Sequence, residues 1–228
     1  MKKLIVSIVM IITATCVTAQ DCSTYYPMIE GSNFTYTSYN KKGKTDGSVN
    51  YKITNVSVQE GSTSATMALQ YFDAKGKEIL TSDYNFSCNG NSVKIDFESL
   101  LSSQMLKQYE GMEMDISGTD IELPNDLDVG QGLADANVAV KVNMSGITMN
   151  IAIDMVNRKV EKKERITTPS GTYDCYVIYS ENKTKMMVAN KTFPSRIWFS
   201  EGIGMIKQES YHPNGKVINS SVLSAFSK

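Results

Sequence analysis

The middle of the chain alternates strictly between apolar and polar side chains. Before a Ser-Gly pair the even positions are apolar, at Val138, Val140, Val142 and Met144. After the pair the odd positions are apolar, at Ile147, Met149, Ile151, Ile153 and Met155. A period of two places one face of a strand in the interior and the other in water. Because the phase flips across Ser145-Gly146, the pattern predicts two long antiparallel strands joined by a tight hairpin.

A second regularity is a turn that occurs three times, in segments 39–44, 72–77 and 211–216. Each copy starts with an aromatic residue and ends in Gly-Lys. The glycine can take a positive φ after a type I turn, which closes a hairpin that carries a bulge. The three copies therefore predict three hairpins, and turn chemistry accounts for them without a ligand.

Strands are predicted along most of the chain. The same patterns place them at 33–40, 48–59, 62–73, 77–88, 134–144, 147–166, 173–189, 196–199, 203–211 and 216–226. We expect one short helix within Phe97–Tyr109, where apolar residues recur at helical spacing, and a loop from Pro124 to Gly132. A sheet of this size twists and must curl to bury one face. The expected fold is mainly β: a large curled antiparallel sheet, a half-barrel of meander hairpins, with one short helix.

The first 19 residues have the features of a secretory signal peptide. Lys2 and Lys3 precede an apolar run, and Val17-Thr18-Ala19 has the small-residue spacing of a cleavage site. The apolar run is shorter than the roughly 20 residues that span a bilayer. We therefore expect a single β domain over 20–228 that is exported and does not span the membrane. Its expected location is the periplasm, the outside of the cell or the outer-membrane surface.

Charge and histidine content narrow the classes of function. The net charge is −1, with 23 basic and 24 acidic residues, whereas nucleic-acid binding requires clustered Lys and Arg. The densest basic run, Arg158–Arg165, also contains Glu161 and Glu164, and its mixed charge is typical of the solvated end of a strand. His212 is the single histidine and lies in a turn, which disfavours most zinc sites and most nucleophile–base pairs. We expect no nucleic-acid partner.

The cysteines indicate a disulfide but not its pairing. Cys16 lies in the predicted signal peptide, and Thr13 stands where lipid attachment usually has an aliphatic residue. Cys22, Cys88 and Cys175 remain. An odd count in an oxidising compartment predicts one disulfide and a free thiol, or an intermolecular bridge.

Acidic side chains gather near one predicted loop, at Glu122, Asp126, Asp128 and Asp135. Their spacing does not match the frame of a calcium loop, because Leu127 and Val129 alternate as in an extended segment. A hydrolase would need two carboxylates roughly 5–10 Å apart, which spacing along the chain does not reveal. We expect no catalytic residue, no metal site and no cofactor.

Methionine and isoleucine side chains on the predicted inner face form the one candidate binding site. They are Met144, Met149, Ile151, Ile153 and Met155. Methionine is flexible and fills irregular space, so core packing is the simplest interpretation. The alternative is an adaptable pocket for a lipid or another hydrophobic ligand inside a half-open barrel.

Three segments together resemble a known family. Cys22–Gly31 leads directly into an aromatic strand, Ser170–Tyr176 contains Gly-Thr-Tyr-Asp-Cys-Tyr, and Ile197–Lys207 contains Trp-Phe followed by Gly-Ile-Gly. In this order they make the chain similar to the TapB-like family of uncharacterised envelope proteins from Gram-negative anaerobes. The resemblance implies tight backbone at Gly202 and Gly204, and it implies no catalytic residue. In outline the expected sheet is also similar to lipoprotein-carrier half-barrels, which hold acyl chains in a concave apolar face.

These observations favour a non-enzymatic module of the cell envelope. It would bind a hydrophobic ligand, or the apolar segment of a partner, on the concave face of its sheet. The alternative is a structural or interaction protein that pairs through a sheet edge or its outer face and has no pocket. A hydrolase built on carboxylates is a third and weaker hypothesis. The patterns specify neither the ligand nor the oligomeric state.

Overall fold

The computed structural model describes residues 22–59, 61–101, 103–144, 147–186 and 189–228. The predicted signal peptide, Cys16 and the Ser145-Gly146 turn lie outside these residues. The strands are β1 (Asn33–Asn40), β2 (Thr45–Gln59), β3 (Ser62–Asp73), β4 (Glu78–Cys88), β5 (Ser92–Ile95), β6 (Glu113–Thr119), β7 (Ile121–Pro124), β8 (Ala136–Met144), β9 (Ile147–Thr168), β10 (Gly171–Met186), β11 (Ala189–Ser200), β12 (Gly204–Tyr211) and β13 (Val217–Ser227). A 3-10 turn, η1 (Phe97–Leu100), and a short helix, α1 (Ser103–Gln108), separate β5 from β6.

All thirteen strands belong to one antiparallel sheet, in the spatial order β6-β8-β9-β10-β11-β12-β13-β1-β2-β3-β4-β5-β7. The two edge strands, β6 and β7, are consecutive along the chain, and Asp120 alone separates them. Because one residue cannot bridge an open sheet, the two edges lie together and the sheet curls nearly into a barrel. The predicted fold class, a large curled antiparallel sheet, is confirmed.

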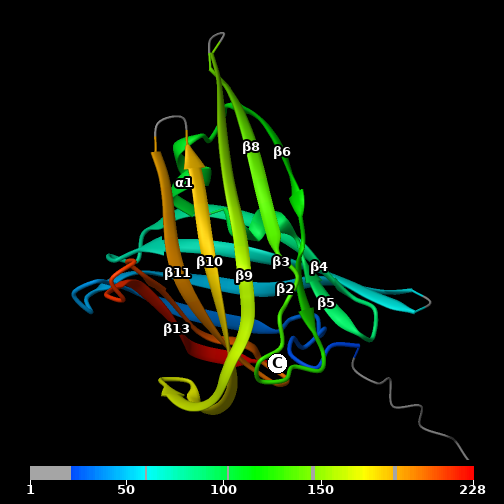
Figure 1. Cartoon of the computed structure of the whole chain (residues 1–228). Helices are drawn as coiled ribbons and strands as arrows, with labels where there is room; N and C mark the ends of the chain where they lie inside the picture. The colour runs from blue at the N-terminus through cyan, green and yellow to red at the C-terminus, as the bar shows by residue number, and fades with distance from the viewer. Residues whose placement is uncertain (1–21, 60, 102, 145–146, 187–188) are drawn as a thin grey trace, which may run out of the picture.

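The curl produces two layers that face each other. In Figure 1, β8 to β11 run up the front, and β2 to β4 cross behind them. The chain passes from one layer to the other through β12, β13 and β1, which are neighbours in the sheet. The short helix α1 lies near the upper end of the interior (Figure 1). Side chains on the concave sides of both layers therefore share one interior.

The three repeated turns adopt one conformation, as their sequences predict. In each, the residue before the turn forms backbone hydrogen bonds with the glycine and with the lysine that follows it. The glycines have positive φ values of 71°, 79° and 80°, at Gly43, Gly76 and Gly215. In the first two turns the side chain of Asn40 or Asp73 also accepts hydrogen bonds from the backbone of the turn. Local chemistry thus closes these hairpins.

An irregularity in β9 changes which side chains face the interior. Before it the odd positions are buried, as at Ile151 and Met155, and after it the even positions are buried, as at Arg158 and Val160. Asn157 lies at the change, with a φ of 53°, and the pairing of β9 with β10 shifts register opposite it. A bulge of this kind re-aims the side chains that follow. The interior therefore receives an arginine.

Several predicted boundaries were wrong. The strands β5, β6 and β7 were not predicted, and β7 ends at Pro124, where the predicted loop begins. The strand expected at 196–199 extends back to Ala189. These segments are short, or they contain glycine or charged residues, so their local pattern does not indicate a strand. They form strands because they pair with distant strands. The helix expected within Phe97–Tyr109 is present as two short pieces, η1 and α1.

The buried side chains form two clusters. The larger, here called the main cluster, draws on β1 to β4 and β10 to β13 and includes Phe34, Ile53, Val177, Ile206 and Leu223. The smaller, here called the helix-covered cluster, comprises the buried residues Leu101, Tyr109, Val138, Val140, Val142 and Ile151. The first two of these come from the η1–α1 segment and the others from β8 and β9. The short helical segment therefore covers one end of the interior.

Candidate binding cavity

A cavity of about 460 Å³ lies in the interior of the curled sheet. Strands of both layers line it, and Leu100 and Met105 of the η1–α1 segment border it. Its buried part is lined by side chains such as Phe34, Ile178 and Phe199. At another part of its wall Asn219 is exposed to solvent, so the cavity opens beside the start of β13.

The predicted ligand face is divided between this cavity and the helix-covered cluster. Ile153 and Met155 line the cavity. Ile151 is 1% exposed within the helix-covered cluster, and Met149 packs against it. Met144 ends β8, opposite Ile147, and its side chain lies outside the described part of the structure. The structure thus brings two of the five predicted residues to the cavity.

Four tyrosines place their rings along the cavity wall: Tyr26, Tyr36, Tyr51 and Tyr84. The Tyr36 hydroxyl donates to the Met205 carbonyl at 2.6 Å, and the Tyr84 hydroxyl lies 3.3 Å from the sulfur of Met67. Burial raises the pKa of each of the four phenols well above its ordinary value. The phenols are therefore neutral, and they give this wall hydroxyl groups without charge.

Small polar side chains from β10 and β11 form another part of the interior. The hydroxyl oxygens of Ser180 and Ser195 lie 2.8 Å apart, and the Asn182 amide donates to Ser195 at 2.8 Å. Ser180 and Ser195 are both buried, and Ser180 and Asn182 line the cavity. These groups bond to one another, so they add polarity to the wall at little desolvation cost.

Arg158 is the only ionisable side chain other than tyrosine among the described residues that line the cavity. It is 5% exposed, which corrects the interpretation of the run Arg158–Arg165 as the solvated end of a strand. Its guanidinium donates to the carbonyls of Ala134 and of Glu122 in β7. Burial lowers the pKa of Arg158 to about 10, so the group stays cationic at neutral pH. The missed signal is the break in alternation beside Asn157, which moves the inner face to even positions.

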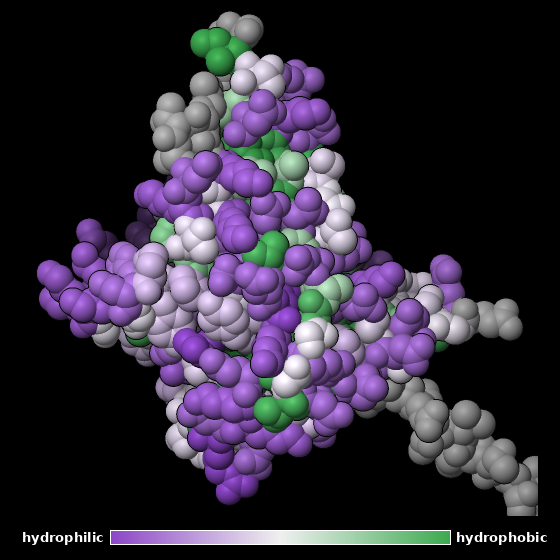
Figure 2. Space-filling model, viewed as in Figure 1, coloured by the Kyte–Doolittle hydropathy of each residue, from purple (hydrophilic) through white to green (hydrophobic). Residues whose placement is uncertain are grey.

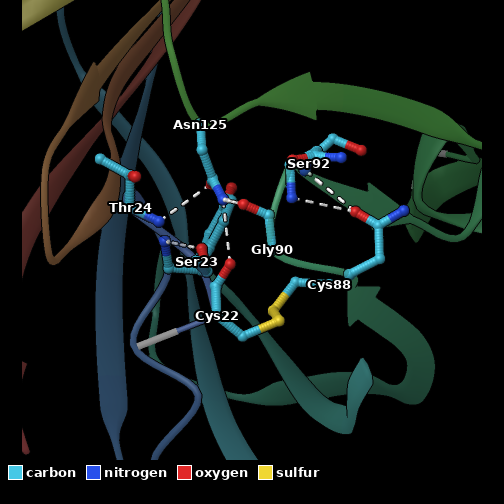
Figure 3. The surroundings of a disulfide bond; sticks show 10 residues. Cys22, Ser23, Thr24, Cys88, Gly90, Ser92 and Asn125 are labelled. Carbon is cyan, nitrogen blue, oxygen red and sulfur yellow. Dashed lines mark hydrogen bonds between the residues drawn. A yellow bond between two sulfur atoms is a disulfide. The ribbon is translucent and has the colours of Figure 1, made fainter. Parts of the chain in front are cut away.

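A disulfide holds the start of the described chain against β4. It joins Cys22 to Cys88, which settles the pairing that the sequence left open. The Asn125 side chain accepts from the Thr24 amide and donates to the carbonyls of Cys22 and Gly90 (Figure 3). This loop side chain therefore ties the disulfide-linked segment to two other parts of the chain.

The anchored segment carries Tyr25 and Tyr26 into the interior. The Tyr26 ring packs edge-on against Phe199 with centroids 6.1 Å apart. A Cβ on Gly204 would lie 2.5 Å from this ring, and the φ of Gly204 is 98°. Only glycine fits this approach without a shift of the backbone or the ring. The tight backbone implied by the resemblance is thus present beside the cavity.

The other candidate groups do not form a reactive centre. Cys175 is free and buried, and burial raises its thiol pKa to about 12, so the thiol is protonated. His212 is exposed in the last of the repeated turns. Within the described ranges no three His, Cys, Asp or Glu side chains gather as a metal site, and the acidic loop is no exception. No helix in the part of the chain described is long and apolar enough to cross a membrane.

Comparison with known proteins finds a matching family model and two solved structures with the same fold. A family model described as DUF3108-like matches residues 29–223. A protein from Bacteroides fragilis, inferred to be exported and to have a YmcC-like fold, superposes with a TM-score of 0.77 at 17% identity, over 91% of this chain and 100% of that one. A protein from Parabacteroides distasonis, inferred to be a lipoprotein, superposes with a TM-score of 0.77 at 22% identity over the same shares. These two show a shared fold, and no curated protein matches the chain.

Proposed function

The chain belongs to the DUF3108-like family, and on that premise we propose that it is a non-enzymatic binding module of the cell envelope. It holds a hydrophobic ligand in the cavity inside its curled sheet. The observation that carries this proposal is the cavity itself, a space of about 460 Å³ with a largely apolar wall. Ligand sites typically occupy about 300–1,000 Å³ and combine apolar walls with a few polar groups.

The distribution of apolar surface supports an internal site. The view in Figure 2 shows a mainly hydrophilic surface over the front layer, with small separate hydrophobic areas. The large apolar side chains that are exposed in the described part of the chain are scattered over different elements: Ile29, Val58, Met112, Val129, Ile147 and Val217. Scattered apolar residues are normal on protein surfaces and do not form a docking face. This favours the ligand-binding hypothesis over pairing through the outer face.

The wall chemistry supports binding rather than catalysis. Among the described residues that line the cavity there is no Asp, Glu, His or Cys. A carboxylate-based hydrolase needs two acids that flank its substrate, and nucleophilic catalysis needs an activated side chain beside a base. Neither arrangement lines this cavity, so the proposal assigns no reaction to it.

An envelope location fits the proposal. The predicted signal peptide over 1–19 would direct the chain out of the cytoplasm, and the two structural neighbours are inferred to be an exported protein and a lipoprotein. We propose that the protein works in the periplasm, at the outer membrane or outside the cell. The finer assignment to the TapB-like family stays a prediction from the motifs.

Native mass spectrometry of the protein purified from an envelope fraction, before and after organic extraction, tests this function. Ile153→Trp places an indole in the cavity, while Ile147→Trp places one at an exposed position of the same strand. We expect a bound species that extraction removes, that Ile153→Trp abolishes and that Ile147→Trp retains. If the wild-type protein carries nothing and the extracted protein takes up no amphiphile, the proposal fails and pairing through the sheet edges becomes the better hypothesis.

A further inference from the structure

Arg158 is a cation, and no carboxylate among the described residues forms an ion pair with it. Two of the five N–H groups of a guanidinium donate to backbone carbonyls, those of Ala134 and Glu122. The Nε atom is buried without a hydrogen-bond partner. The remaining N–H groups therefore have no acceptor among the described residues, although the side chain lines a cavity.

No carboxylate lines the cavity with Arg158 among the described residues. Met155 precedes it on the same strand, Ile121 stands beside its partner Glu122 on β7, and the uncharged Ser180 lies across from the bulge on β10; all three line the cavity with it. Glu122 and Asp135 act on the guanidinium only from a distance, because neither forms an ion pair with it and neither lines the cavity. A buried charge without a paired counter-charge is costly. An anion from outside the chain would lower that cost.

We propose that the ligand is an amphiphile with an acidic head group, a long-chain carboxylate or phosphate monoester, whose head binds Arg158 and whose chain fills the apolar cavity. The inference rests on the proposed function and adds the chemical class of the ligand. A guanidinium suits either head group, because it offers parallel N–H donors to two oxygens. The tyrosine and Ser180–Asn182 walls carry no charge, so the arginine alone distinguishes an acid from a neutral head group.

Arg158 also has a structural role, and the test must separate this role from ligand binding. Its bond to the Glu122 carbonyl links β9 to the edge strand β7, so Arg158→Gln can loosen the seam of the sheet. The first measurement therefore uses the wild-type protein alone. Delipidated protein is titrated calorimetrically with hexadecanoic acid, hexadecyl phosphate, hexadecanol and hexadecyltrimethylammonium, four probes with one chain and different heads.

We expect one or both acids to bind roughly 10- to 100-fold tighter than the alcohol, as a hydrogen-bonded charge pair predicts. The trimethylammonium probe should bind most weakly. Equal affinity for acids and alcohol would overturn this inference and leave the proposed function standing. If no probe binds, both fail. The two acid probes decide whether a carboxylate or a phosphate is preferred.

Two further measurements assign the preference to Arg158. Arg158→Gln should still bind the alcohol but lose its preference for acids, whereas Arg165→Gln, at an exposed arginine of the same strand, should keep it. In the wild-type protein the Nε–H resonance of Arg158 should move with acid and not with alcohol, which decides the matter even if Arg158→Gln does not fold. An unmoved resonance, or a preference that survives Arg158→Gln, would contradict the assignment.

Discussion

Two halves of one face of the strand β9 have different surroundings: one half packs in a cluster and the other borders a cavity. Met149 and Ile151 lie on the same face of β9 as Ile153 and Met155, at the same period and with the same residue types. The first pair packs in the helix-covered cluster and does not line the cavity, whereas the second pair lines the cavity, with Ile153 also in contact with the cluster. The difference comes from what faces them, because Leu101 and Tyr109 belong to the same cluster as Ile151, whereas Met155 lies outside that cluster. An inner-face pattern therefore predicts burial, but it does not distinguish a packed core from a binding site.

Four tyrosines also line the cavity side of this contrast, and we expect alkaline pH to have the largest effect on stability through them. Below pH 10 a phenol is protonated in both folded and unfolded chains, so it adds no pH dependence. Above pH 10 the unfolded chain loses protons that Tyr26, Tyr36, Tyr51 and Tyr84 retain, because burial raises their pKa values. Unfolding free energy should then fall, by about 1 kcal/mol for each of these groups one pH unit above 10.

Denaturant unfolding followed by phenolate absorbance between about pH 8 and about pH 11 measures this effect. Arg158 acts in the opposite direction, because burial lowers its pKa to about 10 and its deprotonation in the folded state removes the cost of a buried charge. One such group does not offset four phenols. We expect these phenolates to appear only as the protein unfolds. Gradual ionisation of all tyrosines in a protein that stays folded would contradict the prediction.

Matched truncations sharpen the contrast between the two halves. Ile151→Ala should lower the unfolding free energy by about 2–5 kcal/mol, since it leaves a hole in a packed cluster. Ile153→Ala should cost only about 1 kcal/mol, because its side chain already borders an empty space. Urea unfolding of both variants measures the difference. Equal losses would mean that the cavity closes in solution and that the two halves are alike.

A substitution on the outer face of the sheet should affect neither half of the β9 face and should change the unfolding free energy least. Arg196 forms two hydrogen bonds with Glu161, at 2.6 and 2.8 Å, and lies over the rings of Tyr179 and Tyr211. Ser195, its neighbour in β11, is buried, so alternation along the strand places Arg196 on the outer face. Arg196→Ala should cost about 1 kcal/mol or less, as partly exposed ion pairs do. Binding of the acid probe should be unchanged; weakened binding would show that the outer face is coupled to the cavity.

Local patterns predicted much of the fold and little of the site. The period of two across Val138–Met155 and the three Gly-Lys turns depend on neighbouring residues. The strands β8 and β9 pair and the three turns form as predicted, although Ile147 at the start of β9 is 62% exposed. The strands β5, β6 and β7 were missed, because short or glycine-containing segments become strands only through distant partners. Of the candidate ligand face, Ile153 and Met155 line the cavity, and Arg158 was assigned to solvent.

The sequence by itself determined most of the antiparallel strands, their main hairpins and, before the bulge in β9, the faces that turn inward, because alternation and turn chemistry act over a few residues. Only the tertiary structure decided which inward residues pack and which surround a space, because that depends on segments far apart along the chain. The η1–α1 segment fills one end of the interior, and the Cys22–Cys88 link brings Tyr26 to the cavity. The bulge at Asn157 brings Arg158 inward and places a cation in a largely apolar wall.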